Sequence, residues 1–167
     1  MLEIKPETKD DYFEVEYLLD LAFAPGRTAL SSYRLRDGVE PVVGLSMVAR
    51  DSYGVLAGAI RYWPVKIGPK AVPALLLGPV AVHPTHQGEG LGGMLIQASL
   101  ERAVELGWSR VILVGDEPYY RRFGFSRAPV LGLEFPPPTN PDRILGRELV
   151  PGAFSGVAGE VRRWSED

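Results

Sequence analysis

One stretch of the chain decides how the rest of the sequence is interpreted. It reads Val80-Ala81-Val82-His83-Pro84-Thr85-His86-Gln87-Gly88-Glu89-Gly90-Leu91-Gly92-Gly93. The apolar run Ala74–Val82 is typical of a strand that is covered on both faces. After the polar turn, apolar residues recur at helical spacing as far as Leu106, and Gly107 favours the end of a helix. The stretch therefore predicts a strand, a glycine-rich loop and a helix in direct succession.

The loop between this strand and this helix has the properties of an anion site. Glycines let the backbone come close to a ligand, and the first turn of a helix offers unpaired N–H groups and the positive end of the dipole. Phosphate suits such a site. The alternative is a glycine-rich turn that only packs tightly, and it carries at least equal weight for glycines considered alone. The position between a buried strand and an amphipathic helix favours phosphate.

Spacing distinguishes this loop from two other phosphate-binding loops. A P-loop ends in Gly-Lys-Ser/Thr, whereas this loop ends in Gly90-Leu91-Gly92. A dinucleotide-binding fold places its glycines after an early strand and an acidic residue on the next strand. Asp116 meets the second condition superficially, but the antiparallel elements expected before the loop argue against that fold. The remaining pattern is Q-x-x-G-x-G over Gln87–Gly92.

This pattern resembles the pyrophosphate loop of the GNAT superfamily of N-acetyltransferases. The strand ending at His83-Pro84 is similar to the fourth strand of that superfamily, and Tyr120-Arg121-Arg122-Phe123-Gly124-Phe125 resembles its Y-x-x-x-G-F ending. The doubled tyrosine Tyr119-Tyr120 is similar to a bacterial subgroup of predicted acetyltransferases. The specific match covers about Leu75–Phe125, and the rest agrees in the order of its elements. Two motifs in the right order, separated by a helix and a strand, form a specific signal.

The resemblance implies one GNAT-like acetyltransferase domain over residues 1–167, of mixed α/β (α+β) class. Its central sheet would be mostly antiparallel and flanked by helices, with a parallel fourth and fifth strand that splay apart. The strand–helix–strand unit around the loop independently predicts a parallel pair. The other expected elements are a strand at Leu2–Lys5, a helix around Val15–Ala22 ended by Pro25-Gly26, a helix at Thr28–Arg36, a hairpin of Val42–Arg50 and Val55–Trp63, a loop or hairpin tip at Pro64–Pro73, a strand at Arg110–Val114, a short helix at Tyr119–Phe123, and strands at Leu131–Phe135, Arg147–Val150 and Gly159–Trp164.

The resemblance also implies acetyl-CoA as co-substrate, with its pantetheine arm between the splayed strands and its pyrophosphate on the loop. An exposed backbone N–H of the fourth strand would stabilise the oxyanion formed when an amine attacks the thioester. The acetyl group would pass directly to a primary amine of a small molecule or a protein, which agrees with the absence of cysteine. The implied cofactor-binding residues are Val80, Ala81, Val82, Gln87, Gly88, Glu89, Gly90, Leu91, Gly92, Gly93, Tyr119 and Phe123.

Tyr120 matches the general-acid tyrosine of the superfamily, which protonates the departing CoA thiolate. The ordinary pKa of tyrosine is about 10 and that of a simple thiol about 8.5, so this proton transfer is not badly mismatched. The alternative is a core ring whose hydroxyl finds a partner. Tyr119 competes for the role, because a shift of the short helix by one residue would exchange the two side chains.

The general base is less clearly marked, because Leu75–Val82 carries no acidic residue. His83, at the end of that strand, is the best-placed titratable group, and an ordinary imidazole suits neutral pH. A histidine that stabilises the turn beside Pro84 is the favoured alternative. Asp116 and Glu117 either act through water or cap the short helix.

The acceptor site is indicated only by position. Arg27, Arg34 and Arg36 lie around the first loop and second helix, where the superfamily often builds its acceptor site, although such arginines are usually solvated surface residues. The segment Arg61–Trp63 ends the hairpin and is a candidate to line the acceptor cleft, but Trp63 fits the core equally well. The sequence does not name the acceptor.

Composition excludes several classes of function. The chain has 18 basic and 21 acidic residues, so it lacks the basic excess of a general nucleic-acid binder. It has no cysteine, which excludes disulfides, thiolate metal sites and a cysteine nucleophile. Two neighbouring histidines without a third ligand are poor evidence for a metal site, so we expect none.

Location and assembly are expectations of the same kind. Met1–Pro6 has no apolar core of a signal peptide, and the broken apolar run Ala71–Val82 is shorter than the roughly 20 residues that span a bilayer. We therefore expect a cytoplasmic protein without a membrane contact. Many members of the superfamily dimerise, which makes a homodimer one state that the resemblance allows. A non-catalytic acyl-CoA sensor is the alternative to an enzyme, and the presence of Tyr120 favours the enzyme.

Overall fold

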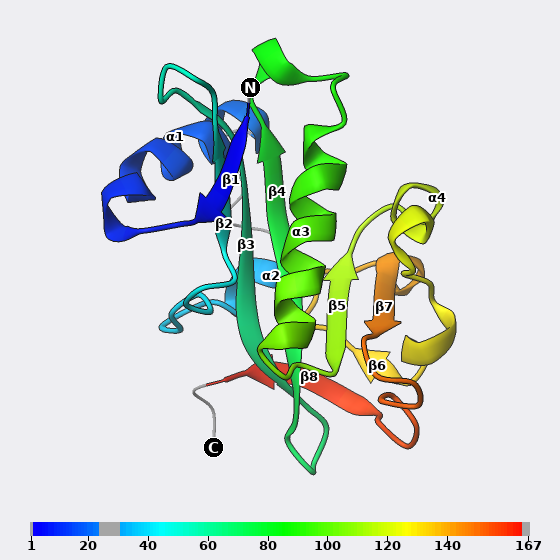
Figure 1. The fold of residues 1–167 in the computed structure, drawn as a ribbon. Helices are drawn as coiled ribbons and strands as arrows, with labels where there is room; N and C mark the ends of the chain where they lie inside the picture. The colour runs from blue at the N-terminus through cyan, green and yellow to red at the C-terminus, as the bar shows by residue number, and fades with distance from the viewer. Residues whose placement is uncertain (1, 24–30, 165–167) are drawn as a thin grey trace.

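The computed structural model describes residues 2–23 and 31–164, and a mixed sheet runs through its centre (Figure 1). Its strands follow the order β1-β2-β3-β4-β5-β7, and β8 pairs with both β3 and β6. Only β4–β5 and β6–β8 are parallel. The strands are β1 (Glu3–Pro6), β2 (Met47–Arg50), β3 (Leu56–Ile67), β4 (Val72–Val82), β5 (Arg110–Val114), β6 (Leu133–Glu134), β7 (Ile144–Glu148) and β8 (Gly159–Arg163).

Helices cover both faces of this sheet. On β2, Met47 and Ala49 pack in the core beneath helix α3, whereas Val48 packs beneath helix α1. Because side chains alternate along a strand, α1 and α3 lie on opposite faces. The helices are α1 (Tyr12–Phe23), α2 (Ser31–Arg34), α3 (Leu91–Glu105) and α4 (Glu117–Tyr120), and short 3-10 turns occur between other elements.

The predicted parallel pair is present, and it opens towards one end. β4 pairs with β5 only at Leu75–Val111 and Leu76–Ile112, and then continues to Val82 without a partner on β5. Ile60 of β3 pairs with Val80, but Tyr62 pairs with Leu77, so an irregularity on β4 faces Arg61. The predicted fold class, a mostly antiparallel sheet with a splayed parallel pair, is confirmed.

The prediction of a loop or hairpin tip at Pro64–Pro73 is wrong in its bounds, because the structure confines the hairpin tip to residues 68–71. β3 continues through Pro64 to Ile67 and β4 already begins at Val72, so only a tight turn separates them. Val65 and Ile67 are fully buried. Their burial in the core outweighs the missing N–H of the proline, which was the signal that suggested a loop.

Other boundaries differ in length. β7 begins at Ile144, three residues before the expected strand, because Ile144 and Leu145 are buried against β5. β6 has two residues instead of five. Pro25-Gly26 and the start of the second predicted helix lie outside the described residues. Within the described part, no helix is long and apolar enough to cross a membrane.

Candidate active site

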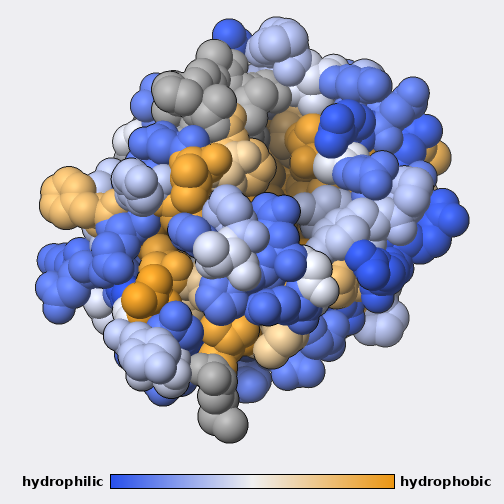
Figure 2. All heavy atoms as spheres, turned by 90° about the horizontal axis from the view of Figure 1, so that it is seen from above, coloured by the Kyte–Doolittle hydropathy of each residue, from blue (hydrophilic) through white to orange (hydrophobic). Residues whose placement is uncertain are grey.

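The open end of the β4–β5 pair forms a cavity of about 650 Å³, here called the β4–α3 cleft. Figure 2 looks down onto this end of the molecule, where hydrophobic residues lie recessed among hydrophilic ones. The cleft is bounded by β4, the loop before α3, the end of α1, and α4 with the 3-10 turn that follows it (residues 117–123), here called the α4 segment. Its lining residues are Ala22, Phe23, Val80, Ala81, Val82, His86, Gln87, Gly88, Gly90, Leu91, Gly92, Gly93, Ile96, Tyr119, Tyr120, Arg122 and Phe123.

The loop gives this cleft a set of backbone N–H groups. Gly88 and Gly90 have φ of +84° and +76°, in the left-handed region that favours glycine. Gly90 is the N-cap of α3, and its carbonyl accepts the first helical hydrogen bond, from Met94 N–H. The N–H groups of the intervening turn have no acceptor inside the helix. Their position at the positive end of the helix dipole suits the binding of an anion.

Two further glycines serve packing. A methyl group in place of the hydrogen of Gly93 would lie 3.2 Å from the Phe123 ring, and one on Gly92 would lie 3.4 Å from the Tyr119 hydroxyl. The α4 segment therefore lies directly against the first turn of α3. The phosphate interpretation fits Gly88 and Gly90, which have open space beside them. The packing interpretation fits Gly92 and Gly93, which accommodate aromatic rings.

The two tyrosines lie edge to face in the cleft wall, with ring centroids 5.0 Å apart. Tyr120 also meets Phe125 at 6.1 Å. It reaches this position because Gly115 has no side chain, since a Cβ there would lie 2.6 Å from its ring. Burial raises the pKa of Tyr120 to about 12. Its hydroxyl is therefore protonated at neutral pH and can donate a hydrogen bond, but it gives up its proton less readily than the hydroxyl of an ordinary tyrosine.

Neither His83 nor Glu89 lines the cleft. The imidazole of His83 caps the turn that follows it: Nδ1 accepts a hydrogen bond from Thr85 N–H at 3.2 Å and bonds the Thr85 hydroxyl at 2.8 Å. The carboxylate of Glu89 lies 2.8 Å from His86 Nδ1. The turn-stabilising alternative for His83 therefore describes its side chain in this structure.

Among the arginines in the described part of the chain, Arg122 is the one that lines the cleft. Its guanidinium lies 4.5 Å from the centroid of the Tyr119 ring. Arg121 points elsewhere: its side chain is 70% exposed and lies 3.8 Å from Glu117. Of the two arginines beside the tyrosine pair, only Arg122 can meet an anion inside the cleft.

A second cavity, of about 790 Å³, lies between α1, α2 and β3 and is here called the α1–α2 cavity. It gathers Arg36, Arg61 and Trp63, three of the residues that the sequence suggested for an acceptor site. Tyr62 is different: it is fully buried in the core beneath α3, with its hydroxyl 2.7 Å from Ser99 Oγ. Arg34 lines another cavity, and Arg27 lies outside the described residues. The lining residues are Glu7, Thr8, Lys9, Tyr12, Phe13, Glu16, Tyr33, Arg36, Asp37, Gly38, Glu40, Pro41, Val42, Val43, Gly44, Ser46, Arg61 and Trp63.

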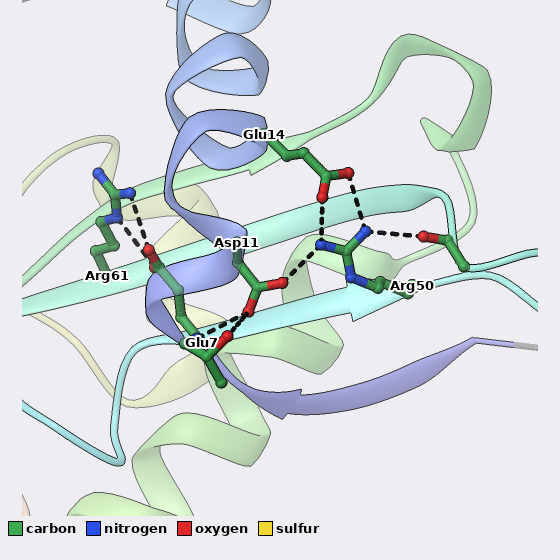
Figure 3. A network of polar contacts seen from close by, with 7 residues as sticks. Glu7, Asp11, Glu14, Arg50 and Arg61 are labelled. Atoms are coloured by element: carbon green, nitrogen blue, oxygen red, sulfur yellow. Dashed lines mark hydrogen bonds and ion pairs between the residues drawn. The ribbon is translucent and has the colours of Figure 1, made fainter.

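Arg61 forms part of the wall of this cavity although it is only 5% exposed. Its Nε and Nη2 donate to the two carboxylate oxygens of Glu7, at 3.1 and 2.9 Å, and Nη1 donates to Glu16. Figure 3 shows the Glu7 contact beside a second network, in which Arg50 joins Asp11 and Glu14 of the α1 segment. Two arginines of the sheet thus hold the beginning of α1 in place.

The sequence did not point to several residues of these two cavities. Ala22 and Phe23 reach the β4–α3 cleft from the far end of α1, and Glu7 and Glu16 meet Arg61 across 54 and 45 residues of chain. An ordinary helix end and ordinary acidic residues carry no local signal for such contacts. Among the residues that the structure describes, no group of three His, Cys, Asp or Glu side chains could hold a metal ion.

With this geometry in view, the comparison with known proteins gives the class. Residues 3–128 match the family described as "Acetyltransferase (GNAT) domain". The chain therefore belongs to the GNAT acetyltransferase family. The prediction from the sequence, an acetyl-CoA-dependent N-acetyltransferase, is confirmed.

Individual relatives support the same class. The protein YhbS of Escherichia coli K12, described as an uncharacterized N-acetyltransferase, is 28% identical over 158 residues, which are 95% of this chain and 93% of YhbS. The crystal structure of E. coli YhbS in complex with CoA superposes with a TM-score of 0.83, covering 97% of this chain and 89% of that one. A GNAT family acetyltransferase from Brucella melitensis, in complex with acetyl-CoA, has 27% identity and a TM-score of 0.73, covering 99% and 97%.

Proposed function

We propose that this protein transfers an acetyl group from acetyl-CoA, bound in the β4–α3 cleft, directly to a primary amine. The observation that carries the proposal is the joint lining of one cleft by the N-terminus of α3, the open edge of β4 and the buried hydroxyl-bearing ring of Tyr120. Two similar proteins whose structures hold CoA and acetyl-CoA support the same co-substrate.

Each part of acetyl-CoA has a matching part of the cleft in this proposal. The pyrophosphate lies on the loop and first helical turn, from Gln87 to Gly93, where backbone N–H groups and the helix dipole favour negative charge. The pantetheine arm runs along Val80–Val82, because that part of β4 has no partner on β5 and its backbone can bind the amide groups of the arm. Tyr119 and Phe123 close the opposite wall.

Transfer then requires one bond to form and one to break. The neutral amine attacks the thioester carbon, and the carbonyl oxygen becomes an oxyanion that a β4 backbone N–H stabilises. The C–S bond then breaks, and Tyr120 supplies the proton that the CoA thiolate takes up. The tyrosinate recovers its proton from solvent, and the nitrogen loses one.

We retain His83 as the candidate that receives the proton of the amine, although its imidazole bonds Thr85. A His83→Ala variant tests this role through the pH dependence of kcat at saturating amine and acetyl-CoA. The acidic limb of the profile should move if His83 is the base. An unchanged limb would assign deprotonation of the amine to water.

A matched pair of variants tests the proposed chemistry. Removing the hydroxyl of a general acid typically costs 10²–10⁴-fold in rate, so we expect Tyr120→Phe to lower kcat by about 10²-fold or more, with little change in acetyl-CoA affinity. Tyr119→Phe removes the same group from the neighbouring ring and should retain most of the activity. The measurement is thiol release with a panel of primary amines, together with acetyl-CoA binding by calorimetry.

The same experiment separates the enzyme from the sensor. Tight acetyl-CoA binding with no thiol release for any amine would favour the non-catalytic sensor. Full activity in Tyr120→Phe would remove the acid role but leave the transfer reaction in place.

A further inference from the structure

We infer that the α1–α2 cavity binds a primary amine carried on an apolar body that contains a ring. The inference rests on the proposed function, because it names the class of acceptor for the same reaction. The volume of about 790 Å³ is in the range of small-molecule sites, roughly 300–1,000 Å³. A cavity of this size encloses a compact ligand rather than a single ammonium group.

Aromatic rings from three separate elements line the cavity. Tyr12 and Phe13 come from α1, Tyr33 from α2 and Trp63 from β3. The rings of Tyr12 and Phe13 meet edge to face, with centroids 5.3 Å apart. Aromatic surface of this kind packs against apolar ligand atoms. Arg36 lies over the rings of Tyr33 and Trp63, and Arg61 over that of Tyr12. The ring that a ligand ammonium can meet is therefore that of Phe13. The cavity therefore suits a ligand that has both apolar atoms and an ammonium group.

Exposure shows where these rings are accessible. Phe13 is 83% exposed and Tyr12 48%, although large apolar side chains are usually buried. Val43, from the loop before β2, lines the same cavity and is 91% exposed. These side chains lie at the opening of the cavity, where a ligand would cover them.

The charges of the cavity favour a cation over an anion. The guanidinium of Arg61 is bound by two carboxylates, and that of Arg36 lies 3.6 Å from the centroid of the Tyr33 ring. Arg61, Glu7 and Glu16 together form a cluster with one excess negative charge, and the remaining carboxylates, Asp37 and Glu40, balance Lys9 and Arg36. The described lining, with four carboxylates against three cationic side chains, therefore has an excess of one negative charge.

The cavity also lies beside the reacting end of the β4–α3 cleft. Arg61 faces the irregular part of β4, next to the point where β4 leaves β5, and Trp63 pairs with Leu76. Helix α1 borders both cavities, with Phe13 near its start and Phe23 at its end. Because Arg61 and Trp63 lie on the strand that pairs with β4, a ring held against Trp63 can direct its amine along the sheet towards the open edge of β4.

The first test measures binding of 2-phenylethylamine to the CoA-loaded protein by calorimetry. Its neutral analogue 2-phenylethanol, spermidine and a lysine-containing tripeptide serve for comparison. We expect 2-phenylethylamine to bind more tightly than all three. Phe13→Ala should weaken its binding about fivefold, the equivalent of one exposed ring contact with a cation. Tyr17→Ala removes another exposed ring from the same helix, outside the cavity, and should change the affinity less than twofold.

A second pair of variants tests the charge of the ligand. Val43 is so exposed that Val43→Lys and Val43→Glu are both compatible with the fold. In low salt, we expect the lysine to weaken and the glutamate to strengthen binding of 2-phenylethylamine, each about threefold, and 2-phenylethanol to respond to neither. Equal or reversed effects of the two variants would overturn the assignment of a cationic ligand.

Thiol release with the same compounds separates the two hypotheses. Transfer to spermidine or the peptide, without binding of 2-phenylethylamine, overturns the inference about the cavity and leaves the acetyltransferase proposal standing. Binding of 2-phenylethylamine that depends on Phe13, without thiol release for any amine, supports the cavity assignment and overturns the proposed reaction.

Discussion

The two cavities of this protein are built in different ways. The β4–α3 cleft is made largely of backbone and of residues that are close in sequence, from Val80 to Gly93, completed by the α4 segment. The α1–α2 cavity is made of side chains from α1, α2, β3 and the loop before β2. A backbone site needs a short motif and tolerates change elsewhere. A side-chain site depends on many positions, each of which can change alone.

This difference explains what each cavity says about function. The glycine loop presents N–H groups to any pyrophosphate, so it identifies the class of donor and little else. The rings and charges of the α1–α2 cavity differ from one sequence to another, so they carry information about the acceptor. If backbone and side chains divide the roles in this way, substitutions in the two cavities should have different effects on stability and on acetyl-CoA binding.

The largest expected effect is a loss of stability on removal of Arg61 from the wall of the α1–α2 cavity. Arg61→Leu leaves Glu7, whose side chain is 11% exposed, without its bidentate partner. Removing one member of a buried ion pair costs about 3–5 kcal/mol, so we expect a loss of this size in the free energy of unfolding, measured with urea. The matched variant Arg102→Leu removes an ion pair on α3 whose two side chains, Arg102 and Glu105, are 43% and 65% exposed.

The loss for Arg102→Leu should be smaller, on the order of 1 kcal/mol or less, because exposed ion pairs contribute little. Equal losses in the two variants would show that the Arg61 network is no more important to the fold than a surface cluster. The α1–α2 cavity would then not depend on its buried side chains.

The backbone site gives the next prediction. Gly90 and Gly54 have φ of +76° and +79°, and neither has a heavy atom within 4 Å of the position of a Cβ. Alanine at either position should cost about 1–2 kcal/mol of stability, the strain of the left-handed conformation. Only Gly90→Ala alters the backbone at the predicted phosphate site, and we expect it to weaken acetyl-CoA binding about tenfold.

Calorimetry with acetyl-CoA measures this difference, with urea unfolding as the check that both variants are equally strained. Gly54→Ala should bind acetyl-CoA like the unmodified protein, since the hairpin turn between β2 and β3 does not line the cleft. If Gly90→Ala also binds normally, the loop is a packing element and the phosphates lie elsewhere.

The difference between the two cavities also explains which parts of the structure could be predicted from the sequence alone. The strand–loop–helix stretch and the Tyr120–Phe125 ending are local patterns, and they predicted the splayed parallel pair and the residues around the cleft. Pro64 was wrongly assigned to the loop or hairpin tip, because the effect of a proline on a strand depends on the burial of its neighbours. No local pattern gives the burial of Val65 and Ile67. The contact of Arg61 with Glu7 crosses 54 residues. Its formation depends on how α1 packs on the sheet, so the α1–α2 cavity could be indicated only by position.

The smallest expected effect is a flat pH profile of kcat, and it concerns Tyr120, the proposed acid in the β4–α3 cleft. Tyr120 must be protonated to act as an acid, so activity should fall only as the pH rises through its pKa. Because burial raises this pKa to about 12, kcat should show no decline between pH 8 and pH 10.5. An ordinary tyrosine, with a pKa of about 10, would instead lower kcat by half at pH 10.

The measurement is kcat at saturating amine and acetyl-CoA, because kcat reports groups in the complex with substrates, whereas kcat/KM also reflects ionisation of the free amine. Tyr119→Phe should give the same flat profile. A decline centred near pH 10 would mean either that ligands bring water to Tyr120 and cancel the effect of burial, or that a different group donates the proton. Repeating the profile in Tyr120→Phe separates these: a decline that persists without the hydroxyl belongs to another acid, and Tyr120 would then be a packing residue of the cleft.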